Sequence, residues 1–169
     1  MPCFDRYIGI DYSGAETPTS SLKGLRIYMA DRASLPHEVL PPPSPRRYWT
    51  RRGIAEWLVM QLSGERPMLA GLDHSFSFPL RYFEKHGLQY DWPSLLKDFQ
   101  HHWPTDENNT YVEFFMDGNR RTGDPSWFRL TEQGTASAKS VFHFDIQGQE
   151  AKSTHAGLPW LQHLRMENR

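Results

Sequence analysis

A five-residue pattern occurs twice in this chain: glycine, an apolar residue, aspartate, any residue and serine. It reads Gly-Ile-Asp-Tyr-Ser at residues 9–13 and Gly-Leu-Asp-His-Ser at residues 71–75. Each copy closes a short apolar run, residues 7–10 in the first case and 68–72 in the second. Short apolar runs that end in turn-forming residues are typical of buried strands. The sequence therefore predicts two strands that each deliver an aspartate at their end.

Side by side, these two strands would bring two carboxylates together. Residues two apart in a strand point to the same side, so Asp11 would point to the same side as Ser13, and Asp73 to the same side as Ser75. A divalent metal ion and phosphodiester chemistry both require such paired carboxylates. The alternative for either copy alone is an ordinary turn after a strand, which Asp and Ser also form. The repetition favours a shared site over two unrelated turns.

Length and composition indicate one globular domain spanning residues 1–169. Hydrophobic residues make up 38 % of the chain and prolines number 13, so we expect a core with long irregular connections. The longest connection is an irregular excursion at about residues 80–139. The formal net charge of −1 gives no overall attraction to nucleic acid. Any polyanion would therefore have to be bound by a local patch.

The first half of the chain predicts a strand meander, a helix and one further strand. Strands are expected at residues 6–11, 25–30 and 38–40. Residues 50–64 carry apolar side chains at helical spacing, with a capping threonine at the start and a glycine at the end. The strand at residues 68–72 is nearly wholly apolar, as expected of a central strand covered on both faces. The helix would carry the chain over the sheet, so that this strand lies parallel to the first.

The second half is less regular. Helices are expected at residues 80–85 and 92–103, where prolines and a glycine mark the ends. Residues 141–146 alternate like a further strand. A helix at residues 154–165 would end the chain. The class predicted by the whole order of elements is α/β.

Three stretches of the chain resemble the DUF429 family of predicted RNase H-like nucleases. They are residues 9–15, 71–79 and 153–161, and their order and spacing agree over nearly the whole chain. The resemblance implies a ribonuclease H-like mixed sheet, in which an antiparallel three-strand meander and one parallel strand are flanked by helices. It also implies that Asp11 and Asp73 are catalytic residues that hold Mg²⁺ or Mn²⁺.

The chain departs from the family pattern at its C-terminal end. Such proteins usually continue into another strand and a final helix that supplies one more acid, whereas this chain stops at Arg169. Either the chain is a naturally short form, or the sheet is C-terminally incomplete and one ligand is absent. The open edge of an incomplete sheet would favour pairing with a second copy as a homodimer. Asp145 is the first candidate for the missing catalytic acid, and Asp124 and Glu113 are the next candidates. An aspartate before Gln-Gly is also a common turn residue, so both interpretations of Asp145 stay open.

Further polar side chains are candidates for substrate binding. Ser13 and Ser75 each accompany one of the two carboxylates. His155, in the third family-like stretch, would reach a phosphate or donate a proton near neutral pH. The alternative for His155 is a partly buried histidine or one that caps the helix. His74 follows Asp73 but faces the other side of the strand, so we expect a packed or surface residue and not a ligand.

Four arginines form the best candidate patch for nucleic acid, namely Arg46, Arg47, Arg51 and Arg52. Tyr48 and Trp49 lie between the two pairs, and arginines with aromatic residues grip phosphates and stack on bases. The alternative is a solvated start of a helix, anchored by Trp49.

Cysteine usage and the lack of apolar segments indicate a cytoplasmic protein. The single cysteine, Cys3, excludes an internal disulfide and zinc sites built from cysteine clusters. Residues 1–6 lack the basic start and apolar stretch of a signal peptide. No run approaches the ~18 apolar residues of a membrane span, so no membrane partner is expected.

The leading hypothesis is a metal-dependent, nuclease-type hydrolase that cleaves phosphodiester bonds of nucleic acid, either DNA or RNA. The alternative is a non-catalytic, nucleic-acid-binding module that lacks the final acid. A phosphotransferase of the sugar-kinase and actin-like superfamily ranks last, because the chain has no phosphate-binding Gly-x-x-x-x-Gly-Lys loop and is too short for a second lobe.

Overall fold

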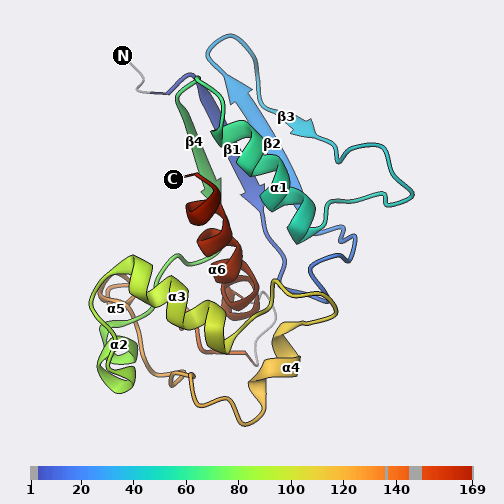
Figure 1. Ribbon diagram of the computed structural model, residues 1–169. Helices are drawn as coiled ribbons and strands as arrows, with labels where there is room; N and C mark the ends of the chain where they lie inside the picture. The colour runs from blue at the N-terminus through green and yellow to red at the C-terminus, as the bar shows by residue number, and fades with distance from the viewer. Residues whose placement is uncertain (1–3, 136, 145–149, 169) are drawn as a thin grey trace.

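Four strands form one mixed sheet in the computed structural model, which describes residues 4–135, 137–144 and 150–168. The strands are β1 Arg6–Asp11, β2 Arg26–Asp31, β3 His37–Val39 and β4 Met68–Leu72. Their order across the sheet is β3-β2-β1-β4 (Figure 1). β1 pairs antiparallel with β2 and parallel with β4, and β2 pairs antiparallel with β3. The predicted meander and the predicted parallel strand beside the first are both confirmed.

The helices of the described chain are α1 Arg51–Leu62, α2 Leu80–His86, α3 Trp92–His102, α4 Val112–Met116, α5 Leu130–Gln133 and α6 Glu150–Glu167. The sequence did not predict α4 or α5, and α6 begins four residues before the predicted start at residue 154, whereas the start of α1 and the end of α2 lie where the sequence marks them. The Thr50 hydroxyl caps α1 by accepting the N–H of Gly53 at 2.9 Å. Gly87 ends α2 with a φ of 63°, a left-handed conformation that favours glycine. Within the described ranges, none of these helices combines the length and the apolar character needed to cross a bilayer.

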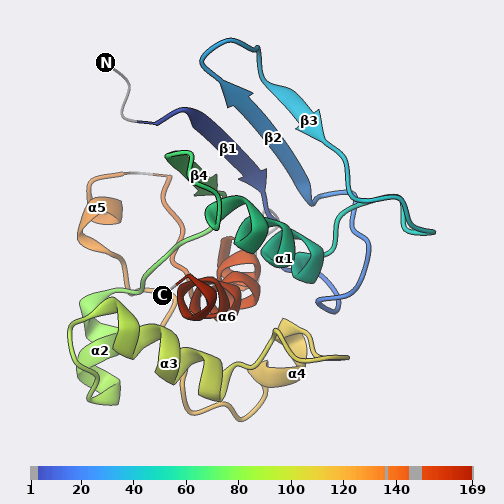
Figure 2. The ribbon, with the colours of Figure 1, turned by 45° about the horizontal axis from the view of Figure 1, so that its top comes forward.

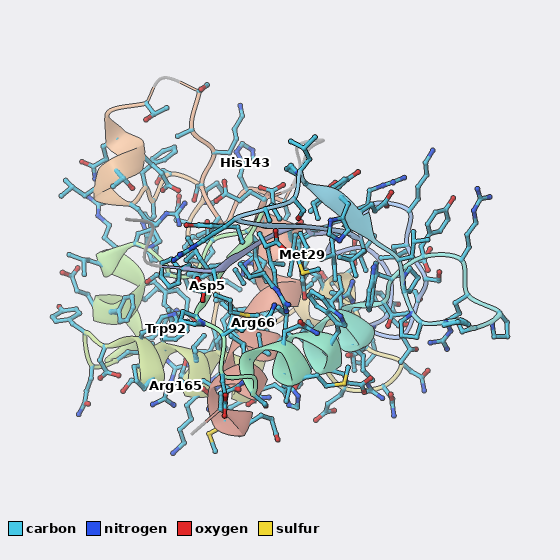
Figure 3. All side chains as sticks on the ribbon, turned by 90° about the horizontal axis from the view of Figure 1, so that it is seen from above. Asp5, Met29, Arg66, Trp92, His143 and Arg165 are labelled. Carbon is cyan, nitrogen blue, oxygen red and sulfur yellow. The ribbon has the colours of Figure 1, made fainter. Side chains whose placement is uncertain are left out.

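One face of the sheet packs against helices. Ile8, Ile10 and Ile27 point to this face and are at most 3 % exposed. They form one apolar cluster with Ile54 and Leu58 of α1. A view turned by 90° shows α1 and α6 on the same side of the strands (Figure 3).

The opposite face of the sheet is open in the part of the chain that the structure describes. Tyr7, Tyr28 and Leu69 project from it and are 37 %, 42 % and 49 % exposed. β4 lies at the edge of the sheet, and every second residue of it faces solvent. The prediction that this strand is central and covered on both faces is therefore wrong. An apolar strand needs only one buried face here, since its outward positions are the exposed Leu69 and the side-chain-free Gly71.

A second apolar cluster lies away from the sheet, among α2, α3 and α6 (Figure 2). Its fully buried members include Tyr82, Phe99 and Trp103. Leu72 of β4 and Leu164 of α6 pack against both clusters. Helix α6, which contacts α1 and α3, therefore joins the sheet layer to the helical part of the chain.

Between α3 and α6, the described residues are irregular apart from α4 and α5. Residues 141–144 do not form the predicted strand. Val141 and Phe142 are both buried, so neighbouring residues do not alternate between core and solvent as a strand requires. The ring of Phe142 lies only 2.2 Å from where a Cβ on Gly123 would be, which shows how closely it packs on that glycine. The rest of that predicted strand, residues 145–146, lies outside the described residues.

Candidate metal centre and active site

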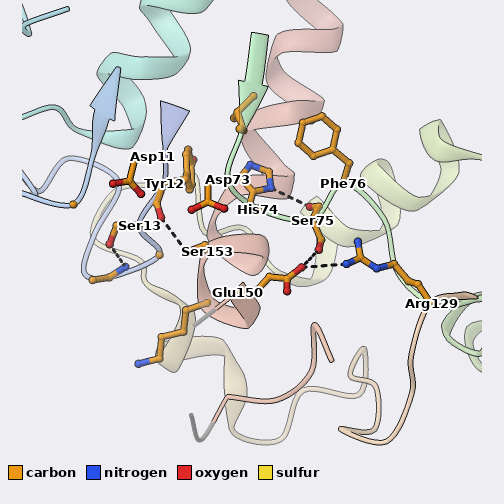
Figure 4. A pocket seen from close by; sticks show the side chains of 15 residues that line it. Asp11, Tyr12, Ser13, Asp73, His74, Ser75, Phe76, Arg129, Glu150 and Ser153 are labelled. Atoms are coloured by element: carbon orange, nitrogen blue, oxygen red, sulfur yellow. Dashed lines mark hydrogen bonds and ion pairs between the residues drawn. The ribbon is translucent and has the colours of Figure 1, made fainter. Parts of the chain in front are cut away.

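A cavity of about 870 Å³ opens where β1 and β4 end. Both copies of the repeated motif line it, together with residues from the first turn of α6 and from the excursion. Figure 4 shows Asp11 and Asp73 beside each other at the strand ends, with Ser75, Glu150 and Arg129 on one flank. The cavity therefore collects acidic, basic and hydroxyl side chains from distant parts of the sequence.

Sheet register brings the two aspartates to the same level. Ile10 and Leu72 are partners in the parallel pairing, and each precedes an aspartate. Neighbouring strands lie about 4.8 Å apart, so Asp11 and Asp73 lie next to each other. Neither carboxylate has a hydrogen bond or an ion pair with any other residue that the structure describes. Both are exposed to the cavity and free to bind a ligand.

The residues that follow the aspartates turn inward and anchor the motifs. Tyr12 and His74 are 6 % and 9 % exposed, and their rings meet edge to face at 4.8 Å. Burial lowers the pKa of His74 to about 4, so its ring is neutral at physiological pH. A Cβ on Gly157 would lie 2.4 Å from His74 Nε2, so α6 can approach this ring only because residue 157 is glycine. His74 is packed, as predicted.

The loop after β1 is held by Arg51, the first residue of α1. Its guanidinium donates to three backbone carbonyl oxygens, those of Ser13 (3.1 Å), Ala15 (2.6 Å) and Glu16 (2.8 Å). The side chain is fully buried. Hydrogen bonds from a buried guanidinium fix the shape of the loop that carries Ser13.

Helix α6 ties both motifs together at its N-terminal end. The Ser153 hydroxyl donates to the Tyr12 carbonyl oxygen at 3.2 Å, and the Thr154 hydroxyl accepts the N–H of Ser75 at 3.1 Å. Gly14 packs directly on the same turn, since a Cβ there would lie 2.2 Å from the Lys152 carbonyl oxygen. One helix therefore holds the two strand ends in a common geometry.

Glu150, the first residue of α6, is a site residue that the sequence analysis missed. It lines the cavity, and its Oε1 accepts hydrogen bonds from the Ser75 hydroxyl and from Arg129 Nη2, the latter at 3.1 Å. Arg129 Nε also donates to Glu132 Oε1, and Glu132 is only 8 % exposed. The available signal was an acidic residue just before the third family-like stretch, since acids favour the first turn of a helix.

The cavity also contains two cations, each paired with an acid. Arg129 pairs with Glu132 and Glu150, and Lys152 pairs with Glu113 of α4. The Arg129–Glu150 and Lys152–Glu113 pairs join the excursion to the first turn of α6. Glu113, a reserve candidate for a catalytic acid, is thus an ion-pair partner, and the Lys152 ammonium helps to lower its pKa.

The structure brings together four of the predicted site residues, Asp11, Ser13, Asp73 and Ser75. It does not place His155 among them. His155 is fully buried among aromatic rings, including Phe99 and Trp103, and burial lowers its pKa to about 4. The prediction that His155 binds substrate is therefore wrong, because its helix face is turned into the core. Asp145 lies outside the described residues.

The four arginines do not form one patch. Arg46 and Arg47 are exposed in the loop before α1 and do not line the cavity. Arg51 is buried beneath the β1 loop, and Arg52 Nη2 donates to the Asp106 carbonyl oxygen at 3.4 Å. Helical periodicity explains the division, since it turns Arg51 toward the core. The predicted substrate contact by Arg51 is wrong.

The two carboxylates suit an open site for a magnesium-type ion better than a site in which protein side chains enclose the metal. Among the described residues, no group of three or more His, Cys, Asp or Glu side chains is placed to hold a metal ion. Mg²⁺ keeps several waters and is commonly bound by one or two carboxylates plus substrate phosphates. Asp11 and Asp73, both free and both lining the cavity, match that requirement.

Comparison of the chain with models of known protein families, with curated proteins and with solved structures found no match.

Proposed function

We propose that this chain is a metal-dependent, nuclease-type hydrolase of ribonuclease H-like architecture, in which Asp11 and Asp73 hold Mg²⁺ or Mn²⁺. The observation that carries the proposal is the pair of free carboxylates on adjacent parallel strand ends, facing one open cavity. The strand order β3-β2-β1-β4 and the resemblance to DUF429 nucleases support the same conclusion.

In the proposed reaction, the metal ion and the side chains of the chain have different roles. A bound divalent metal supplies an acidified water and neutralises charge on the phosphate. Arg129 and Lys152 line the same cavity and are placed to position a phosphodiester by charge-assisted hydrogen bonds. Ser13 and Ser75 add hydroxyl groups beside the carboxylates.

Glu150 is the residue best placed to take a proton from the attacking water. Its Oε1 is occupied by Ser75 and Arg129, whereas its Oε2 has no hydrogen-bond partner in the described ranges. The two buried histidines, His74 and His155, are neutral at physiological pH, because burial lowers the pKa of each to about 4. A carboxylate is therefore the available general base. Asp145 remains a candidate for a further acid.

Cleavage of labelled nucleic acids tests the proposal. The panel holds single-stranded, duplex and branched DNA and RNA, with Mg²⁺ or Mn²⁺. Asp11→Asn and Asp73→Asn should each lower kcat by about 100-fold or more, since a metal contributes several kcal/mol to the transition state. Glu150→Gln should lower kcat with metal binding retained.

Asp117→Asn is the matched control, because Asp117 is exposed, lies outside the cavity and should tolerate the same change with full activity. Wild-type cleavage by Asp11→Asn would refute the proposal.

Two observations favour the alternative, a non-catalytic module that binds nucleic acid. No three-residue metal group exists in the described part of the chain, and Glu150 is held by Arg129. Such a module would bind oligonucleotides with a strong dependence on salt, because phosphate contacts release counterions. Binding without turnover in any metal would establish it, and Arg46 and Arg47 would then be the exposed cations to remove first.

A further inference from the structure

The open face of the sheet leads directly to the paired carboxylates. Five of its residues, Tyr7, Gly9, Tyr28, Leu69 and Gly71, are called the platform below, and Ala30 and Glu38 lie on the same face beside them. In the register of the sheet, Tyr7 is paired with Leu69, and Gly9 with both Gly71 and Tyr28. Two residues further along each strand, on the same face, come Asp11 and Asp73. The platform is therefore continuous with the cavity that these aspartates line.

The two glycines of the platform meet no internal requirement for glycine. A Cβ on Gly9 would have nothing within 4 Å, and one on Gly71 would meet only the Ile8 carbonyl oxygen at 3.9 Å. Neither glycine has a positive φ. Glycine in a strand interior weakens the strand, and it marks places where a ligand or another backbone comes close. Gly9 and Gly71, which are partners in register, therefore form a glycine surface without side chains that ends at the two carboxylates.

Two exposed tyrosines lie beside this glycine surface, and they are independent evidence for a ligand with flat rings. Tyr28 lies beside Gly9 across the β1–β2 pair, and Tyr7 follows along β1. Among the described residues, the Tyr7 ring has one edge contact, with the Phe4 ring, at 6.4 Å between centroids. The Tyr28 ring has no ring contact with any described residue. Exposed aromatic rings on a four-stranded sheet are a known way to stack unpaired bases.

We propose that the platform binds a single-stranded segment of nucleic acid, stacks its bases on Tyr28 and Tyr7, and leads its backbone over Gly9 and Gly71 to the aspartates. This inference rests on the proposed function and names the substrate of that site as single-stranded. A strand rises about 3.3 Å per residue, so the platform extends the site by about 13 Å from Asp11 to Tyr7.

Two other occupants fit the platform less well. A second copy of the chain would cover the exposed Tyr7, Tyr28 and Leu69, but Gly9 and Gly71 between them offer it almost no apolar area to bury. A duplex has its bases paired and stacked on each other, which leaves none to stack on Tyr28.

Substitutions that leave the fold intact test the inference. Binding of labelled single-stranded DNA and RNA, and of the matching duplexes, is measured by fluorescence anisotropy with Ca²⁺ in place of Mg²⁺. Gly9→Val and Gly71→Val should each weaken single-strand binding about tenfold or more, and Tyr28→Leu about tenfold, by loss of one stacking contact. Gly9→Ala is the second variant if valine disturbs the sheet, since its Cβ enters open space.

Stability separates this role from a structural one. Gly9→Ala should unfold at the wild-type temperature or above, while it binds more weakly. Gly134→Ala is the matched control, because a Cβ there also meets open space, away from the sheet, and its φ is −87°. It should leave binding unchanged and, like Gly9→Ala, unfold at the wild-type temperature or above.

The remaining outcomes each overturn the inference. If the wild type cleaves single strands in Mg²⁺ and the platform variants do so equally well, the platform is not used, and the proposed function survives. If the wild type neither binds nor cleaves any nucleic acid, the proposed function fails as well. A dimer seen by light scattering that Gly71→Val disrupts would assign the face to a second copy.

Discussion

The backbone N–H of Asp73 donates a 3.0 Å hydrogen bond to the carbonyl oxygen of Ile10. This bond continues the β1–β4 pairing one residue beyond Leu72, so Asp73 leaves the sheet level with Asp11. A slip of one residue in this register would turn one of the two carboxylates toward the helical layer. The geometry of the proposed metal site is therefore set by main-chain pairing between two segments of distant sequence.

Divalent metal is expected to stabilise the wild-type chain. Mn²⁺ at about 100 times its Kd would stabilise the fold by about 2.7 kcal/mol. For a chain of this size that corresponds to a rise in Tm of roughly 5–10 °C. Asp11→Asn and Asp73→Asn should lose the rise, EDTA should reverse it, and Asp117→Asn should keep it, as measured by thermal unfolding. An equal rise in all variants would place the metal elsewhere.

Arg51→Met is expected to destabilise the fold, because it removes the buried donor to the Ser13, Ala15 and Glu16 carbonyl oxygens. The free energy of unfolding should fall by about 2–4 kcal/mol, since these acceptors lose hydrogen bonds to a charged group. Urea denaturation measures the change. Arg46→Met is the control, and as an exposed substitution it should stay within about 0.5 kcal/mol of wild type. Equal effects of the two variants would contradict the anchoring role of Arg51.

Gly157→Ala should destabilise the chain although alanine is the better helix former. The new Cβ would lie 2.4 Å from His74 Nε2 in a packed region. Overpacking of this kind costs about 1–3 kcal/mol. A double-mutant cycle with His74→Ala checks the cause, because the alanine at position 157 should cost less once the ring is gone. Additive effects would show that Gly157 and His74 do not clash.

Acid is expected to unfold the chain partly through its buried histidines. The pKa of His155 is about 4 in the fold, and its ordinary value is 6.5. Below pH 6.5 the unfolded chain binds a proton that the folded chain excludes, so stability falls as pH falls from 6.5 to about 4. The loss is on the order of 3 kcal/mol for His155. It levels off below the folded pKa.

Urea denaturation between pH 7 and pH 4.5 measures this dependence. His155→Leu should flatten the curve, and the remaining slope should come from groups such as His74, whose pKa is also lowered to about 4. The exposed His101, replaced by leucine, is the control and should leave the slope unchanged. An unaltered slope in His155→Leu would show that His155 titrates freely.

Local sequence patterns were sufficient to predict much of the fold. The first strand at residues 6–11, the Thr50 cap of α1 and the glycine end of α2 follow from alternation and capping, which depend on neighbouring residues only. The repeated motif also predicted correctly that Asp11 and Asp73 lie together, because its two copies end strands that one helical crossover makes parallel. The ribonuclease H-like assignment and the metal remain predictions.

Tertiary packing decided the rest, and no local pattern carried that information. Arg51 and His155 read as polar residues available to a substrate, yet the fold buries both, because what covers a side chain depends on segments far away in sequence. Glu150 entered the site only because α6 docks its first turn against both motifs, through Gly14 and Ser153. Periodicity and capping act over a few residues, whereas burial and the meeting of charges are properties of the packed whole.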